Sequence, residues 1–138
     1  RDELSSTLIK EINYIENETA DNEGLTLNIA FNYGGRAEIV DAAQKICQEK
    51  NNEEIDEETF SDYLYNSEST EVELLIRTGG EKRISNFLLW ESAYAELYFT
   101  STYWPDFSVK DLKEALNDFS ERHRRFGALD KEGEMNVK

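Results

Sequence analysis

The residues with the clearest chemical potential lie between positions 77 and 85. Three cations, two glycines and a hydroxyl group stand there: Arg77, Gly79, Gly80, Lys82, Arg83 and Ser85. Arginine suits phosphate because its planar guanidinium group donates paired, charge-assisted hydrogen bonds. Adjacent glycines permit positive φ angles and would expose backbone N–H groups to an anion. The pattern predicts an oxyanion site; the alternative is a surface loop whose arginines pair with nearby glutamates.

The elements around this cluster are those expected of a ligand site. Residues 72–76 (VELLI) predict a buried strand that stops at Arg77. Ser85 or Asn86 is expected to cap a helix over residues 87–97, whose first N–H groups would add positive charge. Open α/β sheets bind ligands at the carboxyl ends of their strands, so this position favours an anion site over a surface loop.

A second strand and glycine turn precede this region. Residues 25–31 alternate between apolar and polar side chains, which predicts a strand, and Gly34-Gly35 follow it. A helix is expected over 36–50, with its inward side chains at Ile39, Ala43, Ile46 and Cys47. Two such turns indicate that both loops lie on one edge of a parallel sheet. A simple tight connection between strand and helix is the alternative for the glycine pair.

Three further helices are expected. Residues 2–19 predict an amphipathic helix packed on the sheet, with a partner-binding helix as the alternative. Asp56 is expected to cap a short helix. Ser108, with Asp111 at the capping-box position, should begin the last helix. Its predicted buried stripe is Leu112, Ala115, Leu116 and Phe119.

Composition bounds the classes of function. The chain has 138 residues and a formal net charge of −15, with 38% hydrophobic and 12% aromatic residues. This length and apolar content suit one domain or part of a larger one. The strong acidity disfavours nucleic acid as a partner. The single cysteine, Cys47, excludes an internal disulfide and is predicted to be a buried structural thiol.

Three sequence blocks carry a family resemblance. RTGGEKRISNFLLW, AYAELYF and WPDF closely resemble the carboxyl-terminal signature of the cis-prenyltransferase family, which includes the undecaprenyl diphosphate synthases or isoprenyl transferases. The resemblance runs from about Gly24 to Gly127. It implies an α/β, parallel-sheet cis-prenyltransferase-like fold with flanking helices, of which this chain is the carboxyl-terminal portion. Residues 1–128 would form part of a single domain, followed by a flexible tail at 129–138.

The resemblance implies a reaction and a set of site residues. Isopentenyl diphosphate would condense with an allylic diphosphate, expected to be farnesyl diphosphate. The product would be a long cis-polyprenyl diphosphate such as undecaprenyl diphosphate, the carrier for cell-wall sugars. The residues expected to bind substrate are Arg77, Arg83, Ile84, Ser85, Arg125 and Gly127. Glu96 is expected to bind Mg²⁺ against the isopentenyl diphosphate, and a salt bridge to a nearby arginine is the alternative for this acid.

The resemblance also bears on partners and on completeness. It implies a homodimer in which the element with Arg125 and Gly127 reaches the partner's diphosphate pocket. It implies a cytoplasmic protein, with a peripheral membrane contact through the product. The family's Met-Asp-Gly-Asn loop, which binds the allylic diphosphate, has no counterpart in these residues. The catalytic aspartate is therefore expected outside this chain, and the chain alone is expected to be inactive.

Two other functions compete with this interpretation. The chain could be a non-catalytic partner subunit of a cis-prenyltransferase complex, but such subunits usually lose phosphate-site residues, whereas Arg77, Arg83, Ser85 and Glu96 are present. A generic phosphate-binding α/β domain would require the resemblance to be accidental. The sequence therefore favours the enzyme.

Overall fold

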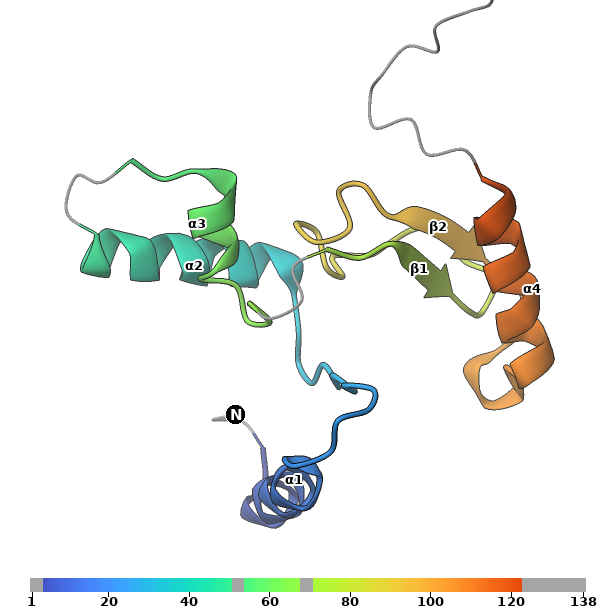
Figure 1. Cartoon of the computed structure of the whole chain (residues 1–138), viewed down its shortest axis with the longest axis horizontal. Coiled ribbons are helices and arrows are strands. Elements are labelled where there is room, and N and C mark those ends of the chain that lie inside the picture. Colours follow the sequence, from blue (N-terminus) through green and yellow to red (C-terminus); the bar gives the residue numbers. More distant parts are fainter. Residues whose placement is uncertain (1–3, 51–53, 68–70, 123–138) are drawn as a thin grey trace, which may run out of the picture. The chain divides into compact units, whose positions relative to one another are not determined.

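The computed structural model describes residues 4–50, 54–67 and 71–122 (Figure 1). The chain divides into two units, Arg1–Phe31 and Asn32–Lys138. The predicted oxyanion site lies wholly in the second unit.

The first unit contains α1 (Ser6–Thr19) and an extended segment after it. Ser5 caps the helix by accepting a hydrogen bond from the backbone N–H of Leu8 at 3.3 Å. The predicted helix is confirmed, but the predicted strand over residues 25–31 is wrong. This segment forms no strand, and the side chain of Leu25 is 94% exposed. A strand needs a neighbouring backbone to bond with, and only β1 and β2 pair among the described residues.

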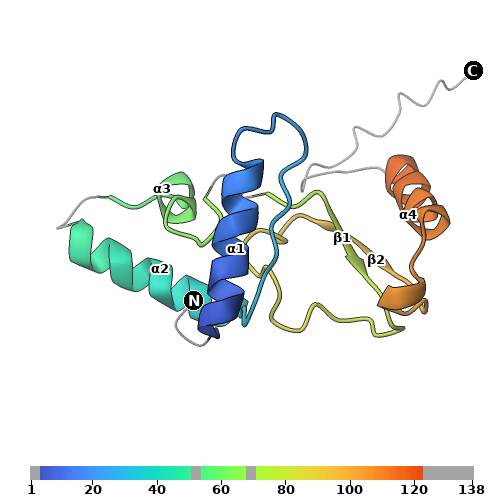
Figure 2. The same ribbon diagram turned by 90° about the horizontal axis from the view of Figure 1, so that it is seen from below.

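The second unit is built on two short parallel strands, β1 (Leu74–Arg77) and β2 (Glu96–Phe99). They lie side by side in Figure 2, with Leu74 opposite Glu96 and Arg77 opposite Phe99. The prediction of a strand that stops at Arg77 is confirmed. Parallel strands need a long connection, and residues 78–95 provide it.

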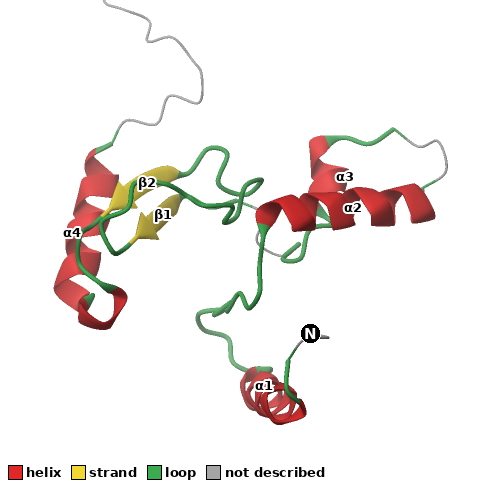
Figure 3. Ribbon diagram, turned by 180° about the vertical axis from the view of Figure 1, so that it is seen from behind, coloured by secondary structure: helices red, strands yellow, loops and turns green. Residues whose placement is uncertain are grey.

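This connection contains no helix, so the predicted helix over 87–97 is wrong. Figure 3 shows the segment between β1 and β2 as loop throughout. The backbone φ angles of Ser85, Asn86 and Leu88 are +49°, +67° and +47°. A right-handed helix requires negative φ at every residue, so the positive φ of Leu88 excludes a helix that begins at residue 87. The last predicted helical residues instead begin β2.

The helix α2 (Gly35–Glu49) confirms the predicted element and part of its predicted face, because Ile46 is buried as expected. Gly35, Glu38, Ala42 and Ile46 are buried, whereas Ala43 and Cys47 are exposed. The predicted buried thiol is therefore wrong. A Cβ atom at Gly35 would lie 2.8 Å from Cγ of Leu89, so the helix approaches residue 89 closely on this side. The buried side chains lie on the face of α2 that makes this contact. That face is shifted by one residue from the face that the sequence predicted.

Two other helices have the predicted caps. Asp56 caps α3 (Glu57–Ser61), which packs on α2, by accepting from the Thr59 N–H at 2.8 Å. After the 3₁₀ turn η1 (Trp104–Asp106), Ser108 and Asp111 form the predicted capping box of α4 (Val109–Glu121).

The helix α4 packs against β2. Ala115 is fully buried at this contact, but Leu112 and Leu116 are 40% and 47% exposed. The predicted buried stripe is therefore correct only in part.

Candidate functional site

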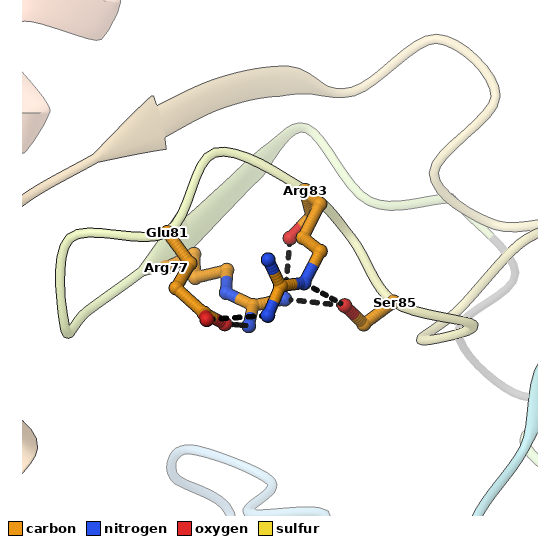
Figure 4. Close-up of polar contacts among 4 residues, drawn as sticks. All are labelled: Arg77, Glu81, Arg83 and Ser85. Atoms are coloured by element: carbon orange, nitrogen blue, oxygen red, sulfur yellow. Dashed lines mark hydrogen bonds and ion pairs between the residues drawn. The ribbon is translucent and has the colours of Figure 1, made fainter.

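Arg77, Arg83 and Ser85 converge at the carboxyl end of β1 (Figure 4). The hydroxyl oxygen of Ser85 accepts a hydrogen bond from Nη1 of Arg77 at 2.9 Å and another from Nε of Arg83 at 3.0 Å. Arg77 Nη1 also donates to the backbone oxygen of Arg83. One serine oxygen therefore holds both guanidinium groups in a fixed relation to each other.

Glu81 completes this arginine cluster, which consists of Arg77, Glu81, Arg83 and Ser85. One carboxylate oxygen of Glu81 contacts Nη2 of Arg77, and the other contacts Nη2 of Arg83. These ion pairs are the alternative that the sequence left open, in which the arginines pair with a nearby glutamate. The same contacts show that two guanidinium groups can bind one anion together, which is the geometry that phosphate recognition uses.

Glu81 was not among the predicted site residues. Its signal was its position as the only acid between the two arginines, four residues after Arg77. Lys82, which was predicted to point at the same spot, is exposed.

The cluster borders a cavity of about 250 Å³. The cavity is lined by Leu75, Ile76, Arg77, Thr78, Ile84 and Phe87. The Arg77 side chain is only 24% exposed, while that of Arg83 is 61% exposed. The site therefore combines the two arginines with a cavity whose lining includes four apolar side chains, among them that of the predicted residue Ile84.

The glycine turn beside the cluster has a different role from the predicted one. Gly79 and Gly80 have φ angles of +87° and +80°, as two glycines permit. Their N–H groups donate to the backbone oxygens of Thr102 and Thr100, at 2.9 and 2.8 Å. The expectation that these N–H groups face a ligand is therefore wrong. The turn lies next to the segment after β2, whose carbonyl groups accept both bonds.

The second glycine turn meets the same loop through Asn86. The backbone oxygen of Asn86 accepts from the Gly35 N–H at 2.8 Å, and its side-chain oxygen accepts from the Arg36 N–H at 2.9 Å. The rings of Tyr33 and Phe87 pack edge to face, with centroids 5.4 Å apart. No strand precedes Gly34-Gly35 among the described residues, so the prediction that both glycine turns lie on one edge of a parallel sheet is wrong, although the two loops do meet. Asn86 caps α2 rather than the segment that follows it.

Glu96 lies away from the arginine cluster. It pairs with Leu74 in the parallel register, three residues from Arg77, or roughly 10 Å along the strand. Because side chains alternate along a strand, Glu96 and Arg77 also project from opposite faces. Glu96 Oε2 accepts from Arg122 Nη1 at 2.8 Å, which is the salt bridge expected as the alternative.

The described residues contain no group of three or more His, Cys, Asp or Glu that could hold a metal. A metal at Glu96 would thus need other ligands, and its role as a Mg²⁺ ligand stays a prediction. Arg125 and Gly127 lie outside the described residues.

A family comparison connects this geometry with known proteins. Residues 1–127 match the family described as "Putative undecaprenyl diphosphate synthase". The chain belongs to the undecaprenyl diphosphate synthase family of cis-prenyltransferases. This membership agrees with the family resemblance of the sequence blocks around the arginine cluster. It also agrees with the parallel strands β1 and β2.

Two curated relatives illustrate the similarity. The isoprenyl transferase of Fusobacterium nucleatum is 51% identical over 129 residues, which cover 94% of this chain and 55% of that protein. The ditrans,polycis-undecaprenyl-diphosphate synthase ((2E,6E)-farnesyl-diphosphate specific) of Buchnera aphidicola subsp. Baizongia pistaciae is 48% identical over 134 residues. The alignment covers 94% of this chain and 53% of that synthase. Both relatives are transferases, and the chain spans about half the length of each.

Solved structures confirm the α/β cis-prenyltransferase fold. A probable undecaprenyl diphosphate synthase from Campylobacter jejuni superposes with a TM-score of 0.80 at 35% identity, covering 91% of this chain and 59% of that one. Lavandulyl diphosphate synthase from Lavandula x intermedia, solved in complex with dimethylallyl diphosphate, superposes with a TM-score of 0.88 at 38% identity. This second alignment covers 91% of this chain and 56% of the lavandulyl diphosphate synthase chain. Among the described helices, none has both the length and the apolar character of a membrane span.

Proposed function

We propose that the full-length protein elongates a cis-polyprenyl diphosphate. It condenses isopentenyl diphosphate with an allylic diphosphate, farnesyl diphosphate in the first cycle. The product is a long chain such as undecaprenyl diphosphate, for the cell-wall lipid carrier. This chain supplies the isopentenyl diphosphate half-site. Family membership and the names of the relatives support the proposal.

The observation that carries the proposal is the convergence of Arg77 and Arg83 on the single carboxylate of Glu81. A diphosphate carries more negative charge than a carboxylate and more acceptor oxygens, so it would displace Glu81 and receive both guanidinium groups. The neighbouring apolar side chains of Ile84 and Phe87 suit a short hydrocarbon. Catalysis then consists largely of holding the isopentenyl alkene near the allylic carbon, with Ser85 fixing the arginines that grip the diphosphate.

Mg²⁺ and a homodimer belong to the same proposal. Glu96 would supply one carboxylate ligand, and the metal would neutralise charge on substrate phosphate oxygens. Glu96 and Arg77 lie on opposite faces of the strand pair, so one chain does not bring them together. In the proposed homodimer, a second copy of the chain would supply one of the two residues to a shared diphosphate. Metal binding must also compete with the ion pair between Glu96 and Arg122.

The test is calorimetric titration of the full-length protein with isopentenyl diphosphate. Arg83→Ala should weaken binding by about 2–4 kcal/mol, or roughly 30- to 700-fold, because it removes a charged contact to phosphate. Lys110→Ala is the control, since Lys110 is an exposed cation on α4 whose side chain pairs with Glu114. Equal affinity of wild type and Arg83→Ala would contradict the proposal.

The alternative, a non-catalytic partner subunit, is not favoured by the site. The arginine cluster keeps its hydrogen bonds through Ser85, whereas a scaffold has no need of paired guanidinium groups. Polyprenyl diphosphate formation by the purified full-length protein alone would exclude the scaffold role.

A further inference from the structure

Two buried glutamates are not used in the proposed chemistry. Glu38 of α2 is 1% exposed, and Glu91, in the loop before β2, is 5% exposed. Glu38 lies close enough to Glu91 to raise the pKa of the Glu91 carboxyl group, through its charge and through hydrogen bonding. Two buried carboxylates at such a distance cannot both be ionised without a large cost, so one of them must carry a proton.

Glu38 has the contacts of the ionised partner. Its Oε2 accepts a hydrogen bond from the hydroxyl group of Tyr33, and its Oε1 accepts from the Tyr65 backbone N–H at 3.0 Å. These two donors stabilise a negative charge on Glu38.

Glu91 has the surroundings of the protonated partner. Both of its carboxyl oxygens are buried, and no donor among the described residues makes a well-formed hydrogen bond to either. Burial raises the pKa of Glu91, and the Glu38 carboxylate raises it further, while the nearby N–H groups of Glu91 and Trp90 lower it in part. A protonated Glu91 donates to Glu38 and thereby satisfies the group that otherwise has no partner.

We propose that Glu91 and Glu38 share one proton, and that this pair is a positioning device that holds the loop carrying Ser85 against the first turns of α2. Three contacts make the connection. Val72 donates to the backbone oxygen of Glu91 at 3.0 Å, which ties this residue to the start of β1. Asn86 and Leu89 of the same loop contact Gly35. Ser85, which adjoins Asn86, in turn fixes Arg77 and Arg83.

The charged and titratable groups around the pair come from each packed segment. Tyr33 precedes α2, and its pKa is raised by burial and by its bond to Glu38. Tyr65 follows α3, and its hydroxyl group donates to Asp41 of α2, which with burial raises its pKa to about 12. Lys45 lies 5.9 Å above the Tyr65 ring. Both tyrosines therefore stay neutral at ordinary pH.

The sign of the pH effect follows from the raised pKa of Glu91. Between the ordinary pKa of glutamic acid and this raised value, the folded protein keeps a proton that the unfolded chain has lost. Stability therefore falls as pH rises through that window and stops changing above it. Ionised Glu91 would repel Glu38, loosen the loop at Ser85 and weaken diphosphate binding. This last step rests on the proposed function.

The experiment uses full-length wild type, Glu91→Gln and the control Glu114→Gln, which replaces an exposed glutamate of α4. The glutamine amide donates to Glu38 at every pH, so this variant should fold. Carbon NMR of the glutamate carboxyl groups should show one group with a raised pKa in wild type and in the control, and none in Glu91→Gln. A titration that does not change in Glu91→Gln overturns the shared proton.

The second measurement is the affinity for inorganic diphosphate across the same pH range. Relative to Glu91→Gln, wild type should lose roughly 2- to 30-fold as Glu91 ionises, the usual range for indirect coupling. If the two proteins keep a constant affinity ratio at every pH, the pair is not a positioning device. Failure of the proposed function is seen separately, because Arg83→Ala would then leave diphosphate affinity unchanged while the NMR titration stays informative.

Discussion

Ser85 connects the chemistry of the site with the strain of its backbone. Its φ angle is +49°, in a region that residues with a Cβ seldom occupy, and Asn86 and Leu88 share this feature. Such conformations are typical of ligand sites, where the surrounding structure enforces them. Here the enforced turn places the serine hydroxyl oxygen between two guanidinium groups.

The hydroxyl group of Ser85 can be tested apart from its backbone. Ser85→Ala and Ser85→Gly should each weaken isopentenyl diphosphate binding by about 1–2 kcal/mol, because both remove the oxygen that holds Arg77 and Arg83. Glycine should not restore affinity even though it accepts positive φ. Calorimetry on the full-length protein measures the loss, with Ser120→Ala on α4 as control. If Ser85→Gly binds isopentenyl diphosphate as tightly as wild type does, the hydroxyl group of Ser85 does not contribute to binding.

At the scale of elements, the start of α2 depends on a residue fifty positions away. Gly34 is the N-cap residue and provides no side chain to bond the first N–H groups of the helix. Asn86 provides both acceptors instead, one from its backbone and one from its side chain. The helix and the loop of the arginine cluster therefore stabilise each other.

Substitution of Asn86 should separate its two contributions. Asn86→Gly keeps the positive φ and loses the side-chain bond to Arg36, which should lower the free energy of unfolding by about 1 kcal/mol. Asn86→Ala adds the cost of a left-handed conformation, about 1–2 kcal/mol more. Urea unfolding of the full-length protein would show this order, and Asn117→Ala on α4 is the control. Equal stability of the glycine and alanine variants would contradict the assigned conformation.

At the scale of the whole molecule, a strongly acidic protein is proposed to bind an anion. The net charge of −15 opposes the approach of diphosphate, but charges beyond a Debye length of about 8 Å are screened at physiological ionic strength. The two guanidinium groups act at contact distance, where screening is weak. The local cluster thus outweighs the distant field.

Ligand binding should therefore be visible in the stability of the entire protein. Isopentenyl diphosphate at about 100 times its Kd should stabilise the folded state by about 2.7 kcal/mol and raise Tm. Arg83→Ala at the same ligand concentration should lose most of this increase. Thermal unfolding of both full-length proteins, with chloride at matched ionic strength as the reference, makes the comparison. Equal increases in Tm would show that the ligand binds elsewhere.

The sequence alone determined features that depend on neighbours along the chain. Glycines at 79 and 80 predicted positive φ, and Asp56, Ser108 and Asp111 predicted helix caps, because these depend on residues a few positions away. The blocks around Arg77 also identified the family. Local sequence therefore located the cationic cluster and the strand that presents it.

Tertiary structure decided what depends on contacts between distant segments. The close approach of Gly35 to Leu89 selected the buried face of α2, and the strand register separated Glu96 from Arg77. Residues 25–31 alternate as a strand should, yet a strand exists only with a neighbouring backbone to bond. The juxtaposition of Glu38 and Glu91 is of the same kind: each is an ordinary glutamate in the sequence, and only the fold buries them together.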